Sequence, residues 1–190
     1  GVGYGALYSQ NVNGDAHNTA VGYTAGVAVT TGIQNTFIGG LSGSSITEAN
    51  QNVAVGHGTL DADTLGARSV AVGTNSLTTQ NFTTATNTYN VAAGYFSGAN
   101  ITTGIQNTLI GGLAGDALTD ADYNVAIGYA SLTADTLGSK STAIGVGTLE
   151  SQNFTTATDS FNTAVGYTAG LSVTTGTLNT IVGALAGDAL

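Results

Sequence analysis

The sequence contains no proline, cysteine, methionine or tryptophan, and only 7% of its 190 residues are charged. The absence of cysteine excludes a disulfide framework and removes the thiolates of a structural zinc site. The 29 glycines argue against a helical bundle, because each interior glycine costs a helix about 1 kcal/mol relative to alanine. The 42% hydrophobic content is too high for a disordered polar tract, and no apolar run approaches the ~20 residues of a membrane span.

Basic residues are almost missing, since Arg68 and Lys140 are the only two and the net charge is −9. A protein that binds nucleic acid neutralises phosphates with several lysines and arginines. Binding to an anionic membrane surface likewise requires several lysines and arginines. We therefore expect neither nucleic acid nor a membrane as a partner of this segment.

A short phrase recurs along the whole chain: Asn or Ser, then Thr or Val, an apolar residue, then Val, Ile or Ala, then Gly. The closing glycines are Gly22, Gly39, Gly56, Gly73, Gly94, Gly111, Gly128, Gly145, Gly166 and Gly183. Their sequence numbers rise in steps of 17, except for two steps of 21. Three steps of 17 and one of 21 make a 72-residue cassette of four coils.

The cassette defines the predicted organisation of the chain. Residues 19–90 and 91–162 align without gaps and agree at about 40 of 72 positions. We interpret 1–18 and 163–190 as partial cassettes, and 1–190 as one solenoid segment of a longer fibre. Each cassette ends in a four-residue insertion, within Gln-Asn-Phe-Thr-Thr-Ala-Thr at 80–86 and 152–158.

The 17-residue period is too short for a helical pair or a propeller blade. It is typical of one coil of a parallel β-solenoid, that is, a β-roll or β-helix. With stacked strands ~4.8 Å apart, about ten coils would form a rod on the order of 50 Å long. The glycine after each apolar triplet is expected at a tight corner with positive φ. The asparagines that open the coils predict a structural ladder. They are Asn18, Asn35, Asn52, Asn90, Asn107, Asn124, Asn162 and Asn179.

The apolar triplets are hydrophobic on both faces of the strand. The first and third residues, such as Thr19 and Val21, share one face, and the middle residue, such as Ala20, lies on the other. Strands that are apolar on both faces are usually buried on both. We expect one face to fill the coil and the Ala20-type column to contact neighbouring chains in a homotrimer. The alternative is a wider single-chain solenoid in which two sheets face each other.

The repeated phrase resembles two known groups of proteins. Ser69–Gly73 and Ser141–Gly145 resemble the head repeats of trimeric autotransporter adhesins of the YadA type, which fold as trimeric β-rolls. Asn162–Tyr167, followed by Thr174-Thr175-Gly176, is similar to repeats in phage and bacterial fibre proteins. The resemblance implies an extracellular or virion location, a homotrimer and a role in attachment.

Candidate chemistry is sparse. His17 and His57 lie in different parts of the coil, so no Ser-His-Asp set is indicated. Asp61 and Asp63 could form a glycosidase-like carboxylate pair, but only one of them recurs in the next cassette, as Asp135. A separate acidic group, Asp116, Asp120 and Asp122, could offer oxygen ligands to Ca²⁺, although the repeat of calcium β-rolls is absent. We expect solvated carboxylates that keep the chain soluble, with no catalytic residues, metal or cofactor.

A column of threonines raises ice binding as a rival function. It consists of Thr30, Thr47, Thr64, Asn81, Thr102, Thr119, Thr136, Asn153 and Thr174. A flat ice-binding face usually needs two such columns. A single column is explained by β-propensity and by ladder bonding.

Aromatic residues supply the remaining contact candidates. Tyr23, Tyr95, Tyr129 and Tyr167 follow the coil glycine and could form an exposed stripe. The insertions should bulge outward as loops, and loops often carry the binding face. Their candidate partner-contact residues are Phe82, Thr83, Thr84, Phe154, Thr155 and Thr156. The alternative is that the two phenylalanines tuck down as plugs between chains.

The sequence therefore predicts a structural shaft or head segment of a cell-surface or virion fibre, not an enzyme. Its expected partners are two further copies of itself and a host-surface glycan or protein. A self-assembling extracellular filament and an ice-binding solenoid remain as alternatives.

Overall fold

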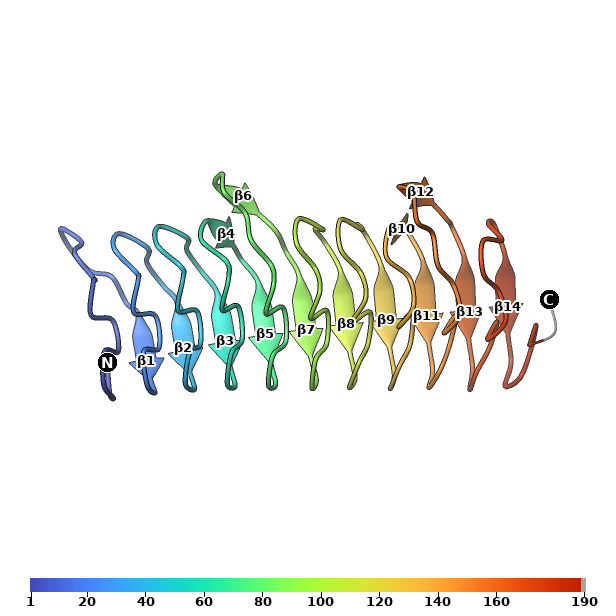
Figure 1. Ribbon diagram of the computed structural model, residues 1–190, viewed down its shortest axis with the longest axis horizontal. Helices are drawn as coiled ribbons and strands as arrows, with labels where there is room; N and C mark the ends of the chain where they lie inside the picture. The colour runs from blue at the N-terminus through green and yellow to red at the C-terminus, as the bar shows by residue number, and fades with distance from the viewer. Residues whose placement is uncertain (189–190) are drawn as a thin grey trace.

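The computed structural model describes residues 1–188 and forms a straight stack of coils (Figure 1). The predicted all-β class is confirmed: the chain is a parallel β-solenoid of about ten turns, with one strand of a long sheet in each repeat of the phrase. No helix that could cross a membrane occurs within the described part of the chain. The last two residues of the predicted 163–190 portion lie outside the described residues.

One long sheet forms a wall of the rod. Its ten strands, each three residues long, follow one another in chain order and pair in parallel, with equivalent residues of the phrase opposite each other. They are β1 (Thr19–Val21), β2 (Thr36–Ile38), β3 (Val53–Val55), β5 (Val70–Val72), β7 (Val91–Ala93), β8 (Thr108–Ile110), β9 (Val125–Ile127), β11 (Thr142–Ile144), β13 (Thr163–Val165) and β14 (Thr180–Val182).

Each insertion adds a small sheet of its own. β4 (Gly66–Ala67) pairs with β6 (Thr86–Asn87), and β10 (Gly138–Ser139) pairs with β12 (Thr158–Asp159). Both insertions project beyond the outline of the other coils, as Figure 1 shows at β6 and β12. The long sheet continues past them in unbroken register.

The glycine after each strand makes the corner that ends it. Gly22 has a φ of 140°, and a Cβ there would lie closer than 3.0 Å to the carbonyl oxygen of Gly39 in the next coil. Gly39 stands in the same relation to Gly56. Glycine is therefore required both by the backbone conformation and by the close approach of adjacent coils.

The rest of each coil consists of turns, many of them built on residues other than glycine at positive φ. Gln34 (φ 61°) and Leu41 (φ 60°) are two examples. This left-handed conformation costs roughly 1–2 kcal/mol per residue. Hydrogen bonds between coils offset the cost. The backbone N–H of Gln34 donates to the Ala16 carbonyl at 2.7 Å, and the backbone N–H of Leu41 donates to the Tyr23 carbonyl at 2.9 Å.

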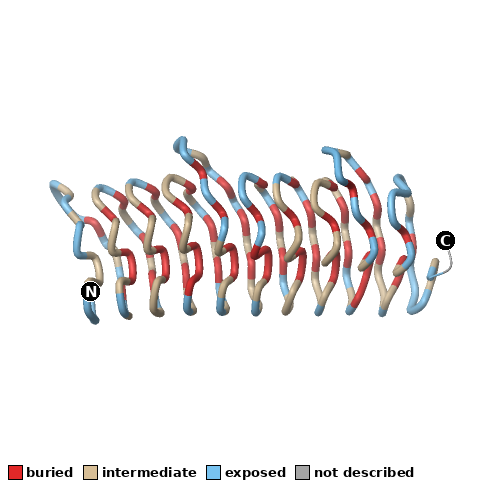
Figure 2. Tube along the Cα trace, in the orientation of Figure 1, coloured by how far each residue is buried: buried red, intermediate tan, exposed pale blue. Residues whose placement is uncertain are grey.

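The core is a continuous column inside the rod, visible as the line of buried residues in Figure 2. The middle residues of the strands form one side of it, including Ala20, Phe37 and Leu109. Ile46 and Leu118 are among the side chains that close it from the opposite wall. The prediction that the Ala20-type column contacts neighbouring chains is therefore wrong. A 17-residue coil is narrow, and seven of the ten middle residues are alanine, with Phe37, Leu109 and Ile181 as the larger ones.

The outward side chains are consequently the first and third residues of the strands. Val21, Ile38 and Val72 are each 40% exposed although they belong to the apolar phrase. The prediction that this face fills the coil is also wrong. The wider solenoid with two facing sheets is not what forms either, because the described residues contain one long sheet and two two-stranded ones.

Candidate functional surfaces

The coil-opening asparagines bond each coil to the next. The side-chain oxygen of Asn35 accepts the backbone N–H of Asn52 at 2.9 Å, and its amide nitrogen donates to the Ala49 carbonyl at 2.9 Å. Asn107 makes the same two bonds with Asn124 and Ala121. The bonds run mainly from side chain to backbone, so each asparagine satisfies buried main-chain groups of its neighbour.

The two insertions carry the predicted contact loops. Phe82 and Phe154 lie buried within their own chain, so neither offers its ring to a partner. Thr83 and Thr84 are exposed at the tip of the first loop, and Thr155 and Thr156 at the tip of the second. Of the six predicted contact residues, the four threonines are the exposed ones.

A buried carboxylate holds the base of each insertion. One oxygen of Asp63 accepts the backbone N–H groups of Gly66 and Phe82, at 3.0 and 3.2 Å, and the other accepts the Gln80 amide at 2.6 Å. Burial raises the pKa of Asp63, although the bonds from Gln80 and from the backbone oppose the shift. Asp135, the equivalent residue of the second insertion, makes the corresponding bonds. These carboxylates fix the loops, and their oxygens are already engaged.

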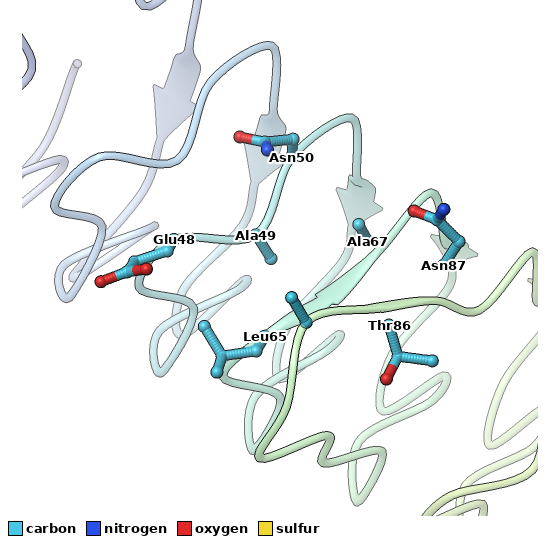
Figure 3. A pocket seen from close by; sticks show the side chains of 8 residues that line it. Glu48, Ala49, Asn50, Leu65, Ala67, Thr86 and Asn87 are labelled. Carbon is cyan, nitrogen blue, oxygen red and sulfur yellow. The ribbon is translucent and has the colours of Figure 1, made fainter.

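A hollow of about 320 Å³ lies where the first insertion steps away from the rod (Figure 3). Leu65 and alanines form its apolar lining. Glu48 and Asn50 stand on one side, and Thr86 and Asn87 on the other. The side-chain oxygen of Asn50 already accepts the Ile33 N–H at 2.7 Å. The hollow is open and mixed in character, without a convergent set of polar groups.

The other acidic candidates do not converge either. Asp61 accepts the Ser44 hydroxyl, so it does not pair with the buried Asp63. Asp116, Asp120 and Asp122 bond to three different neighbours. Burial is the main cause of a raised pKa at Asp122, with Asp120 and Asp159 adding to it.

The potential metal ligands and the two histidines do not gather into a site within the described residues. Residues 1–188 contain no group of three or more His, Asp or Glu side chains placed to hold a metal ion. His17 precedes strand β1, whereas His57 follows strand β3. The two imidazoles therefore belong to different coils and do not form a joint site.

The predicted threonine column bonds to its own chain. The hydroxyls of Thr30 and Thr47 each donate to the carbonyl of the next threonine, at 3.3 Å. Thr119 does the same at 3.0 Å, and Thr64 donates to the Phe82 carbonyl at 2.8 Å. These hydroxyls serve the ladder between coils, which explains the column without an external ligand.

The outward side of the long sheet is uncovered, and we call it the outer face. It consists of the first and third residues of its ten strands. The first residues are Thr19, Thr36, Val53, Val70, Val91, Thr108, Val125, Thr142, Thr163 and Thr180. The third residues are Val21, Ile38, Val55, Val72, Ala93, Ile110, Ile127, Ile144, Val165 and Val182. No charged residue belongs to either column.

Tyrosines continue the outer face past the corner glycine. Tyr23, Tyr95, Tyr129 and Tyr167 are each about 60% exposed. Tyr4 stacks on Tyr23, with ring centroids 5.6 Å apart. The tyrosines of the expected stripe are therefore exposed beside the apolar columns, with Gly40, His57 and Thr74 between Tyr23 and Tyr95 in the same column.

Both basic residues lie on the other flank of the outer face, two positions before a strand. The Arg68 guanidinium donates to the Tyr89 hydroxyl at 2.6 Å and to the Gln51 side chain at 3.0 Å. Lys140 pairs with Asp159 and lies 5.2 Å from the centre of the Phe161 ring. Each cation is thus tied to its own chain and lies over an aromatic ring of it.

Sequence reasoning missed the valines and isoleucines of the outer face as surface residues. A signal was present, because these positions carry larger side chains than most middle positions of the strand. Small residues suit the inside of a narrow coil, and bulky ones are free to point outward.

Comparisons of the chain with protein-family models, curated proteins and solved structures give no match. The resemblance to adhesin and fibre repeats therefore remains a matter of the quoted phrases, and the functional argument depends on the geometry.

Proposed function

We propose that this chain is a structural shaft or head segment of an extracellular or virion fibre, which assembles as a homotrimer and supports attachment. The observation that carries the proposal is the uninterrupted parallel stack of ten strands, bonded along the rod axis by backbone and asparagine side chains. Hydrogen bonds aligned with the axis resist bending and extension.

A spacer acts through its length, so the first experiment changes the length. A second copy of residues 91–162 inserted after Asn162 keeps the register of the phrase and adds four coils. The rod should then lengthen by about 19 Å, at ~4.8 Å per coil, when measured by small-angle X-ray scattering. An increase in girth in place of length would contradict the proposed role.

Light scattering tests the assembly. The proposal expects a species of three times the 18.7 kDa chain mass. A mass that grows steadily with concentration would favour the filament alternative. A stable monomer would contradict the homotrimer.

Exposed Thr83 and Thr155 lie at the loop tips, where a host glycan or protein would be contacted.

A further inference from the structure

We propose that the outer face is the surface through which copies of this chain pack together. The inference rests on the proposed assembly and specifies where it occurs. The occupant is a second copy of the same chain, seated along the length of the rod. Neither the insertion loops nor the inward Ala20-type column serves this purpose.

The first argument is the chemistry of the surface. Nine of the ten third residues are valine or isoleucine, and four of them are 40% exposed: Val21, Ile38, Val72 and Ile110. The first residues are threonine or valine throughout. An extended exposed apolar surface of this kind marks an interaction site on a soluble protein.

The second argument is the distribution of charge. All 11 acidic residues lie outside the outer face and outside the columns that flank it at the Tyr23 and Arg68 positions. Two chains of net charge −9 repel each other wherever their carboxylates approach. The outer face allows two copies to meet without opposing carboxylates, which favours a second copy over an acidic partner.

The third argument is area. Ten strands at ~4.8 Å give a length of about 48 Å, and the seven residues from each Arg68-type to each Tyr23-type position span about 20 Å. In a homotrimer this ~1,000 Å² per copy is divided between two neighbours, so each contact buries about 1,000 Å² in total, which is the lower end of the range for a biological interface. Two copies also share the same coil spacing, so ridges and grooves can interlock along the whole rod.

The test places glutamate on alternate coils of the face, in the triple variant V72E/I110E/I144E. All three side chains point outward, so the coil should keep its circular dichroism spectrum while the assembly falls to a monomer by light scattering. The variant V72K/I110K/I144K should also be monomeric, because lysine breaks apolar packing even though it lowers the net negative charge.

A matched control carries the same three added charges elsewhere. T83E/T155E/T175E changes exposed threonines off the outer face and should leave the wild-type mass unchanged. A milder variant, V72T/I110T/I144T, keeps β-branched residues in every strand. If the glutamate chain fails to fold, this threonine variant decides the question, and its assembly should require at least a tenfold higher protein concentration.

The outcomes separate the inference from the proposed function. An assembled wild type that survives both charged face variants, or that is dissociated by the control, would overturn the inference and leave the fibre role standing. A monomeric wild type would overturn the inference together with the homotrimer. Thermal hysteresis of that monomer in freezing solution would favour the ice-binding alternative.

Discussion

The contact between Phe37 and Gly43 gives the sharpest test of the described core. Phe37 is fully buried, and its ring occupies the space where a side chain at Gly43 would lie. A Cβ at Gly43 would lie closer to the ring carbons than van der Waals contact allows, and the residue also has a φ of 58°. Gly43→Ala should therefore be destabilising for two separate reasons.

The magnitudes can be worked out term by term. The left-handed backbone costs an alanine roughly 1–2 kcal/mol, and overpacking against the ring adds typically about 1–3 kcal/mol. Phe37→Ala alone should cost about 3–5 kcal/mol. In the Phe37→Ala background the ring is gone, so Gly43→Ala should cost only its backbone term. The double variant should thus be less destabilised than the sum of the singles, by about 1–3 kcal/mol.

Urea unfolding followed by circular dichroism, at fixed protein concentration, measures these four free energies. Amide hydrogen exchange in adjacent coils is the complementary readout, because stacked repeats can open locally. Gly115→Ala is the matched comparison one cassette later, where φ is 55° and the Cβ would meet the methyl groups of Leu109 and Leu118 in place of an aromatic ring. Strict additivity of Phe37→Ala and Gly43→Ala would refute the described packing.

Three further predictions follow from buried polar groups and from the insertion. Asn107→Ala should destabilise the rod by about 2–4 kcal/mol in urea unfolding, because it leaves the Asn124 N–H and the Ala121 carbonyl unpaired, and a cost below about 0.5 kcal/mol would contradict the ladder. Because burial raises the pKa of Asp63 above its ordinary 3.8, the folded chain holds this proton more tightly than the unfolded one, and wild-type stability should fall as the pH rises through that raised pKa. The double variant Asp63→Asn/Gln80→Glu should keep the side-chain hydrogen bond between residues 63 and 80 and should change how stability depends on pH. An unchanged pH profile would contradict the assignment of this dependence to Asp63. Phe154→Ala should cost about 3–5 kcal/mol, and a neutral effect would mean that the ring is not packed.

The coil and its register could be predicted from the sequence, because the 17-residue spacing leaves one geometry for a chain with so little helix-forming potential. The corner glycines followed from the same pattern, and Gly22 has the positive φ that a corner requires. The left-handed turns at residues such as Gln34 and Leu41 could not be predicted. Neither residue type favours positive φ, and the conformation is held by bonds to neighbouring coils.

The inside and outside of the strand could not be assigned from periodicity. Alternation separates faces only when one is polar, and here Ala20 and Val21 are both apolar. Side-chain volume is the better guide in most coils, since the interior accommodates Ala20 and leaves Val21 outside. Phe37 and Leu109 are larger residues that nevertheless lie inside. The position of Phe82 was equally ambiguous, because a projecting loop can still turn one ring inward. Its partner at the loop base, Asp63, recurs with Gln80 at the same spacing in the next cassette, a pairing that the sequence already contained.

The central claim is that each 72-residue cassette adds the same length of straight rod. Thr31, Thr103 and Thr175 are exposed and occupy equivalent positions in successive cassettes, and the chain has no native cysteine. Pairs of spin labels on cysteines at these sites, in protein diluted with unlabelled chain, give the distances directly. Residues 31 and 103, and residues 103 and 175, should each be about 19 Å apart, and 31 and 175 about 38 Å. A distance between residues 31 and 175 that is clearly shorter than the sum of the 31–103 and 103–175 distances would contradict the straight rod.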